Sequence, residues 1–221
     1  MSIEKIYEAI NSNRIVHEIV ANAPLNVIER MQVVTFEVGR FMLHQDEYHD
    51  YTYLLVEGRV KIYLISPNGK SVVLDVYGPG MFLGEQEAII KKPYSASIIN
   101  ITPVTLLKMS NQDFVNWSQH DHRFANRMIS YLSEQIYHLT KRTERYSLYS
   151  AMQQIGLELM QSFKEQRPIS REQLTYRVDT SYRNINRVLK QLSELGIIDA
   201  SKPAIKIINV EELQRIIKTE E

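Results

Sequence analysis

The segment 33–109 alternates between hydrophobic and polar residues with a period of two, which is the period of a β-strand that buries one face. The run 60–65 shows this alternation most clearly, and Asn68-Gly69 separates it from a second β-rich run at 72–74. An Asn-Gly pair between two such runs predicts a hairpin. Glycine and proline interrupt further short runs at close intervals, so we expect an antiparallel β-sandwich or barrel.

Helical spacing appears on both sides of this segment. The first 30 residues carry isoleucines at near-helical intervals and predict short helices. From about Asn111 to Tyr146, apolar residues recur at steps of four and three, which predicts one long helix with a heptad seam. This spacing is typical of a helix that packs along a partner helix, so we expect a dimer interface. The seam residues are Ala125, Ile129, Leu132, Ile136, Leu139 and Thr143.

A second apolar stripe on the same helix leaves an alternative open. Phe124, Met128 and Leu132 are spaced to pack against the sheet of their own domain. A helix that packed only there would form no dimer, whereas two stripes suit both contacts together. We expect both contacts, and we place the domain boundary after the helix, between domains at 1–146 and 147–221.

The C-terminal part predicts two short helices separated by a tight turn. Ser170 with Gln173 three positions later is a capping box, which starts a helix. Asp179 tolerates the left-handed conformation of a turn. A second helix over about 180–192 follows, and its opening Thr-Ser pair supplies the N-cap.

The second helix has an apolar face and a basic face. This combination, followed by two short β runs that predict a small wing, is typical of a winged helix-turn-helix, whose second helix enters the major groove of DNA. Arg can form two hydrogen bonds with guanine, and Asn can form two with adenine. Arg183, Asn186 and Arg187 are therefore the predicted base contacts. The full set of predicted DNA contacts is Ser170, Thr180, Ser181, Tyr182, Arg183, Asn186, Arg187, Lys190 and Lys202.

One alternative and the composition limit this interpretation. A charged row is often only solvated, and the alternative is therefore a partner-binding module with weak DNA affinity. The 26 basic and 26 acidic residues balance to zero net charge, so DNA binding must come from a local patch.

The chain has no cysteine, which excludes disulfides and cysteine-ligated iron–sulfur clusters. No apolar run approaches the length of a membrane span, and the first residues lack a secretory signal, so we expect a cytoplasmic protein without a membrane partner.

Enzymatic and metal chemistry find no support in the sequence. The chain contains no Walker loop, nucleophile elbow or HExxH pattern, so we expect neither an enzyme nor catalytic residues. The segment 44–50 concentrates histidine and carboxylate groups but is typical of a polar hairpin loop. We expect no metal site there, nor at the His-Asp-His segment 120–122.

Four short segments of the N-terminal half occur in a fixed order. They are Glu57-Gly58-Arg59-Val60, Tyr77-Gly78-Pro79-Gly80, Phe82-Leu83-Gly84-Glu85 and Ser95-Ala96-Ser97. With these segments the chain resembles the CRP/FNR family of bacterial regulators over nearly its whole length. The segment 181–183 looks closest to a branch resembling the YeiL-type regulators. The resemblance implies an α+β fold, with an N-terminal antiparallel β-roll (a jelly roll, cyclic-nucleotide-binding-like), a long dimerisation helix over about 111–146 and a C-terminal winged helix-turn-helix. It also implies a homodimeric transcription regulator of two-fold symmetric DNA sites, with RNA polymerase as a partner for an activator.

The effector cassette departs from the family pattern. Cyclic-nucleotide binders of the family carry a Gly-Glu pair for the ribose and an Arg-Ser pair for the cyclic phosphate. Gly84, Glu85 and Ser95 match these positions, but Tyr94 stands where the Arg would be. Tyrosine carries no charge at neutral pH, so a phosphate would lose its cation. We therefore expect no cyclic nucleotide, with a cAMP-like receptor as the alternative; no cofactor is predicted, and haem sensing is left open.

The second helix departs as well. The usual family pattern is Ser-Arg-Glu-x-x-x-Arg, and the chain has Tyr182 and Arg183 in place of the first Arg and the Glu, while Arg187 keeps the last Arg. Glu accepts a hydrogen bond from cytosine N4, and Arg cannot. We expect an operator that differs from the best-known half-site of the family.

Overall fold

The computed structural model describes residues 3–69, 71–178 and 180–218, without the side chains of residues 145 and 146. The chain separates into two compact units, 1–134 and 135–221, which are described one at a time. The division falls inside a helix, and the functional boundary between 146 and 147 stays a prediction.

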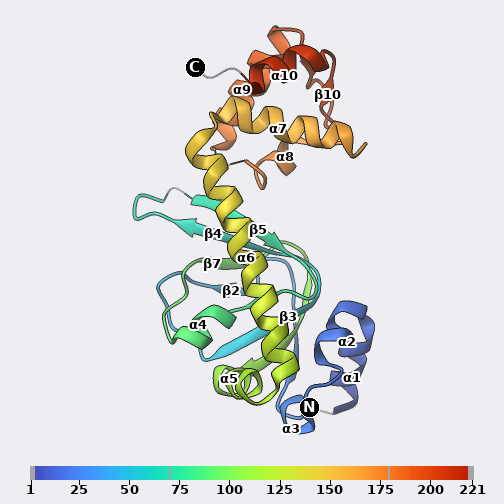
Figure 1. The fold of residues 1–221 in the computed structure, drawn as a ribbon, viewed down its shortest axis with the longest axis vertical. Helices are drawn as coiled ribbons and strands as arrows, with labels where there is room; N and C mark the ends of the chain where they lie inside the picture. The colour runs from blue at the N-terminus through green and yellow to red at the C-terminus, as the bar shows by residue number, and fades with distance from the viewer. Residues whose placement is uncertain (1–2, 70, 179, 219–221) are drawn as a thin grey trace. The chain divides into compact units, whose positions relative to one another are not determined.

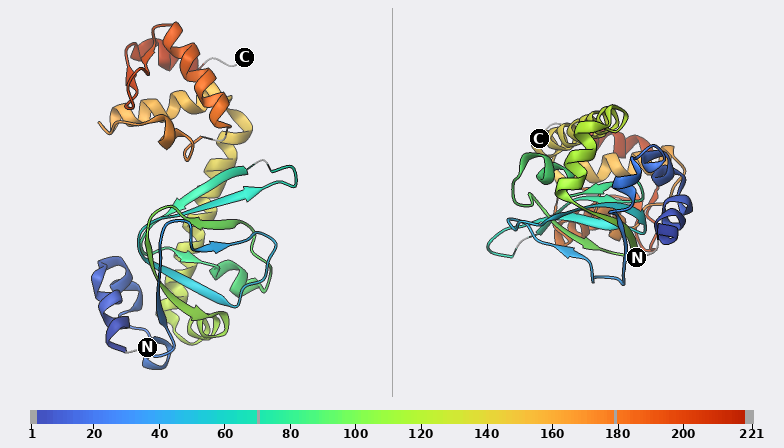
Figure 2. Two further views of the ribbon diagram at one scale, coloured as in Figure 1. Left: turned by 180° about the vertical axis from the view of Figure 1, so that it is seen from behind. Right: turned by 90° about the horizontal axis from the view of Figure 1, so that it is seen from below.

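The N-terminal unit is an antiparallel β-roll, which confirms the predicted jelly roll (Figure 1). Among the described residues, its strands form two four-stranded sheets in the orders β1-β8-β3-β6 and β2-β7-β4-β5. The predicted hairpin is β4 paired with β5, and it projects from the roll as a long ribbon (Figure 2). The strands are β1 (Gln32–Phe36), β2 (Met42–Leu43), β3 (Tyr51–Glu57), β4 (Val60–Ile65), β5 (Ser71–Tyr77), β6 (Phe82–Leu83), β7 (Ser97–Asn100) and β8 (Val104–Ser110).

The roll encloses one apolar core. Helices cover one side of the roll and bury a second apolar core against it. Short helices occur in the first 30 residues, as predicted. Trp117 stacks on Phe124 with ring centroids 3.6 Å apart and planes 4° from parallel, and Phe82 and Phe114 pack beside them. The helices are α1 (Ile3–Ser12), α2 (Arg14–Val20), α3 (Leu25–Ile28), α4 (Glu85–Ile90), α5 (Asn111–His120) and α6 (His122–Leu148).

The prediction of one long helix over about 111–146 is wrong at Asp121, where the chain breaks into α5 and α6. Asp121 adopts an extended conformation, with φ −113° and ψ 100°. Its carboxylate accepts hydrogen bonds from the amides of Arg123 at 2.9 Å and Phe124 at 3.2 Å. An aspartate that bonds the amides after it caps a new helix instead of continuing the old one. The heptad spacing of apolar residues does not reveal this competition between a side chain and the helix for backbone amides.

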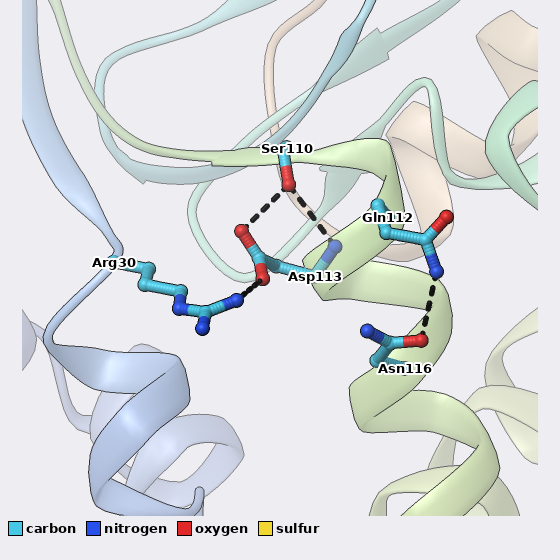
Figure 3. Close-up of polar contacts among 5 residues, drawn as sticks. All are labelled: Arg30, Ser110, Gln112, Asp113 and Asn116. Carbon is cyan, nitrogen blue, oxygen red and sulfur yellow. Dashed lines mark hydrogen bonds and ion pairs between the residues drawn. The ribbon is translucent and has the colours of Figure 1, made fainter.

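The start of α5 is tied to the segment after α3 (Figure 3). Arg30 Nη1 lies 2.7 Å from Asp113 Oδ1, and the Ser110 hydroxyl donates to Asp113 Oδ2 at 2.6 Å. Partial burial alone would raise the pKa of Asp113, but the hydrogen bonds from Ser110 and Arg30 outweigh burial and lower it. The helices on this side of the roll are thereby linked to each other.

The two predicted stripes of α6 differ in burial. Phe124 and Met128 are buried in the helical core of the N-terminal unit. Ile129, Ile136 and Leu139 are 64%, 65% and 59% exposed. The single chain therefore leaves part of the heptad seam uncovered. Within the described residues, no helix is both long and apolar enough to cross a membrane.

The C-terminal unit packs helices around a separate apolar core. Gly156 on α7 permits α10 to approach closely, because a Cβ there would lie 2.8 Å from Ile217 Cγ1. The elements are α7 (Ala151–Lys164), α8 (Arg171–Leu174), α9 (Tyr182–Glu194), β9 (Ile198–Asp199), β10 (Lys206–Ile207) and α10 (Val210–Lys218).

Candidate nucleic-acid interface and sensor cassette

The helix α9 divides into two faces, as the spacing predicts. Its apolar residues are buried in the core of the C-terminal unit; they are Ile185, Val188, Leu189 and Leu192. The helix runs from Tyr182 to Glu194, so the predicted bounds 180–192 are two residues too early at both ends. Ser181 is the N-cap and its hydroxyl accepts from the Asn184 amide at 3.2 Å, which leaves Thr180 outside the helix.

The element before α9 also follows the prediction. Ser170 and Gln173 form the capping box of α8, with the Gln173 side chain accepting from the Ser170 amide at 2.8 Å. Leu174 and Val178 are buried. Asp179, predicted in the turn, lies outside the described residues. Two short helices with a turn between them therefore present α9 as the second helix of a helix-turn-helix.

Most predicted contact residues of α9 lie on its solvent face. Tyr182 is 56% exposed, Arg183, Arg187 and Lys190 are exposed, and Asn186 is half-buried. A salt bridge of 3.7 Å joins Lys190 to Glu194, and an exposed pair of this kind contributes little to stability. The face is thus basic and open to a ligand.

Arg187 is held by a neighbour on the same helix. Its Nε donates to Asn184 Oδ1 at 3.0 Å, and Asn184 Nδ2 donates to Thr180 Oγ1 at 2.7 Å. The sequence interpretation missed Asn184. Its spacing of three residues from Arg187 is the spacing of side chains that touch on a helix, whereas Thr180 lies before the helix.

The predicted wing is present as the antiparallel pair β9–β10. Lys202 lies exposed between the two strands. Arg171 at the start of α8 donates to the Ala200 carbonyl at 2.5 Å, and the Ile205 amide donates to the Ile169 carbonyl at 3.0 Å. These bonds connect the wing to the first helix of the pair.

A partly buried ion pair anchors the turn of the helix-turn-helix. Arg177 Nη1 lies 3.3 Å from Glu158 Oε2, and Glu158 belongs to α7. Glu158 is buried. Nineteen residues separate the partners in the chain, so no local sequence signal could have identified this pair.

The four cassette residues lie together, but tyrosine fills the space. Gly84 has φ +83°, and a Cβ at Gly84 would lie 1.9 Å from the Tyr94 hydroxyl oxygen. Only glycine fits both the backbone conformation and this contact. Tyr94 is buried in the interior of the roll, and its hydroxyl donates to the Tyr51 carbonyl at 3.3 Å.

Ser95 already binds a carboxylate of the protein. Glu87 Oε1 accepts from the Ser95 amide at 3.1 Å and from the Ser95 hydroxyl at 2.7 Å. An amide and a hydroxyl pointing at one oxygen form an arrangement that suits an anion. The anion in this structure is Glu87, a residue that the sequence interpretation missed because nothing in its spacing indicates the contact.

No cassette residue lines the hollow of about 560 Å³ at the ends of β1 and β8. Its lining residues are Thr35, Phe36, Glu37, Glu57, Gly58, Thr102, Pro103, Val104 and Thr105. Across the part of the chain that the structure describes, no three His, Cys, Asp or Glu residues are grouped to hold a metal ion.

Comparison with known proteins covers both units. Residues 33–121 match the cyclic nucleotide-binding domain, and residues 126–216 match the Crp-like helix-turn-helix domain. The chain belongs to the CRP/FNR family. This family is one of transcription regulators.

Members of the family are similar to this chain, in sequence or in fold, over most of its length. A CRP-like cAMP-activated global transcriptional regulator of Mycobacterium tuberculosis is 20% identical over 198 residues, which span 85% of this chain and 88% of the relative. The c-di-GMP responsive global regulator CLP of Xanthomonas campestris has a TM-score of 0.66 at 18% identity and covers 83% of this chain and 99% of its own. A CooA mutant of Carboxydothermus hydrogenoformans has a TM-score of 0.67 at 15% identity, with 90% and 94% covered. The two structures show a shared fold.

Glu85, the acidic residue of the cassette, is buried in the N-terminal unit. Burial raises its pKa from 4.5 to about 8, although hydrogen bonds from its own amide and from Gln86 oppose the shift. The folded protein therefore keeps a proton on Glu85 at a pH at which the unfolded chain has released it.

Protein stability should consequently fall as the pH rises from about 5 to about 8, by roughly 1.4 kcal/mol per pH unit from this group. Urea unfolding at about pH 5.5 and about pH 7.5 measures the slope. In Glu85→Gln, which cannot ionise, this contribution should disappear. Equal slopes in the two proteins would show that Glu85 does not carry a buried proton.

Proposed function

We propose that the chain is a homodimeric, sequence-specific transcription regulator that recognises a two-fold symmetric duplex DNA site with α9. The observation that carries the proposal is the division of this helix. Its apolar face is buried in the helix-turn-helix core, while Tyr182, Arg183, Arg187 and Lys190 lie exposed on the other side. In proteins of this design the second helix enters the major groove with such a face.

Base recognition is assigned to Arg183, Asn186 and Arg187, with Tyr182 as a further contact. Arg can form two hydrogen bonds with guanine O6 and N7, and Asn can do so with adenine N6 and N7. Because Tyr182 and Arg183 replace the usual Arg-Glu pair, the preferred half-site should differ from the best-known one of the family.

Phosphate contacts are assigned to Ser170, Thr180, Ser181, Lys190 and Lys202. The hydroxyl groups of Ser170 and Ser181 accept bonds from helix amides, and each retains its own proton for donation to a phosphate. These contacts would position the protein on DNA without selecting a sequence.

The homodimer is assigned to the exposed seam of α6. Ile129, Ile136 and Leu139 lie on one face of the helix at heptad spacing, and each is more than half exposed. A second copy would cover the same residues by symmetry. If the regulator is an activator, RNA polymerase would be its further partner.

Salt dependence of duplex binding tests the proposal. Contacts with phosphates release counterions, so the logarithm of the affinity for duplex DNA should fall steeply and linearly with the logarithm of the salt concentration. The control is Lys190→Ala with Lys202→Ala, which should give a shallower slope. A flat response in the wild-type protein would instead favour a partner-binding module.

We further infer that a cyclic nucleotide is not the effector. The amide and hydroxyl of Ser95 are occupied by Glu87, Tyr94 fills the space over Gly84, and the position of the usual Arg supplies no cation. A ligand that binds only the folded state raises its melting temperature. We expect cAMP and cGMP to leave the melting temperature unchanged, and a dose-dependent rise would contradict the inference.

A further inference from the structure

Asn184 has both ends of its side chain in use. Arg187 Nε can only donate a hydrogen bond, so the oxygen of Asn184 faces it, at 3.0 Å. The amide nitrogen of Asn184 then faces Thr180, whose hydroxyl oxygen accepts at 2.7 Å. Thr180 precedes α9, so this chain of bonds connects the segment before the helix to the middle of its exposed face.

The bond to Asn184 limits how Arg187 can present its guanidinium group. The Nε atom carries a single hydrogen, and Asn184 accepts it. A guanidinium group can bind guanine through two donors at its end, Nη1 and Nη2, or through a side that includes Nε. With Nε engaged, only the pair Nη1 and Nη2 remains for two parallel bonds.

We propose that Asn184 is the positioning residue that determines the specificity of Arg187, a proposal that rests on the proposed function of α9 in DNA recognition. Asn184 holds Nε, and the guanidinium end with Nη1 and Nη2 contacts guanine O6 and N7. Thr180 in turn fixes the amide of Asn184. Asn184 is not assigned a base contact of its own, because its oxygen and its nitrogen each already form a hydrogen bond within the protein.

The other asparagine of α9, Asn186, keeps a separate assignment. Asn186 is on α9 beside the basic row and remains the predicted contact for adenine. Removing the side chain of Asn184 should leave the fold intact, because the bond that caps the helix uses the backbone amide of Asn184 and the hydroxyl of Ser181. A change in specificity would therefore report on the side chain alone.

The test measures discrimination between base pairs. The DNA probes are the duplex that the wild-type protein prefers in a random library and a set in which each half-site base pair is replaced in turn. The variants are Asn184→Ala, Asn184→Asp and Thr180→Val, with Gln191→Ala as an exposed control on the same helix. Aspartate keeps an acceptor for Nε, whereas alanine does not.

We expect Asn184→Ala to lose about fivefold in discrimination, in line with the loss of one hydrogen bond. The loss should occur at one G·C pair, the pair at which Arg187→Ala loses discrimination. Affinity for unrelated duplex DNA should not change. Asn184→Asp should retain the preference, Thr180→Val should show a smaller loss, and Arg187→Ala with Asn184→Ala should discriminate no worse than Arg187→Ala.

Two results would overturn the positioning role. One is full discrimination by Asn184→Ala at the Arg187 pair, and the other is a loss of discrimination at a different base pair. A wild-type protein that discriminates between no base pairs would overturn the proposed function together with the positioning role. Failure of the proposed function is thus distinguishable from failure of the positioning role, because only failure of the proposed function appears in the wild-type protein.

Discussion

Replacement of Ile136 and Leu139 by glutamate should convert the protein to a monomer. Both side chains are exposed in the single chain, at 65% and 59%, so the substitutions cost the monomer little, within about 0.5 kcal/mol. Across a dimer the new carboxylates would face one another in an apolar seam. Binding to a two-half-site operator should weaken at least about 100-fold, because the half-sites would then be bound independently. Light scattering measures the mass, and titration with operator DNA measures the affinity.

The matched control places the same charges elsewhere on α6. Ser130→Glu with His138→Glu adds two carboxylates at exposed positions outside the seam, and this variant should remain a dimer. If the seam variant also remained a dimer with unchanged operator affinity, α6 would not be the dimer interface. The alternative, in which α6 packs only on its own domain, would then hold.

Arg187→Ala should cost the protein its preference at one position of each half-site. A two-bond contact between Arg and guanine discriminates against other bases by about 1–3 kcal/mol, which corresponds to about 5- to 150-fold. The variant should still bind unrelated duplex DNA, since the phosphate contacts remain. Lys190→Ala is the matched comparison, because loss of a phosphate contact should weaken binding to all sequences alike and reduce the salt slope by about one.

Competition titrations with operator and unrelated duplex DNA separate these two effects. An Arg187→Ala protein with full discrimination would show that the residue contacts the backbone or nothing. A Lys190→Ala protein with altered sequence preference would reverse the two assignments.

Features that depend on local periodicity could be predicted from the sequence. The hairpin of β4 and β5 follows from alternation on either side of a tight turn, and the buried face of α9 follows from its apolar spacing. The capping box of Ser170 and Gln173 was equally visible, because both partners lie within one helical turn. These elements are determined by residues that are close together in the chain.

Features that depend on one side chain or on distant partners could not be predicted. The break at Asp121 results from a carboxylate that competes with the helix for two amides, and periodicity does not register such competition. The contact of Glu87 with Ser95 exists only after the chain has turned back beyond α4. The pair of Glu158 and Arg177 likewise requires the packing of the C-terminal unit. The contacts that close the cassette and the ion pair that anchors the turn before α9 therefore needed the structure.

Selection of bound sequences from a random duplex library tests sequence-specific recognition through α9 most directly. The wild-type protein should enrich a two-fold symmetric site whose half-sites differ from the best-known one of the family. Arg183→Ala with Arg187→Ala should enrich no such site while keeping salt-dependent binding. Enrichment of no site by the wild-type protein, or of the same site by the double variant, would contradict recognition by this helix.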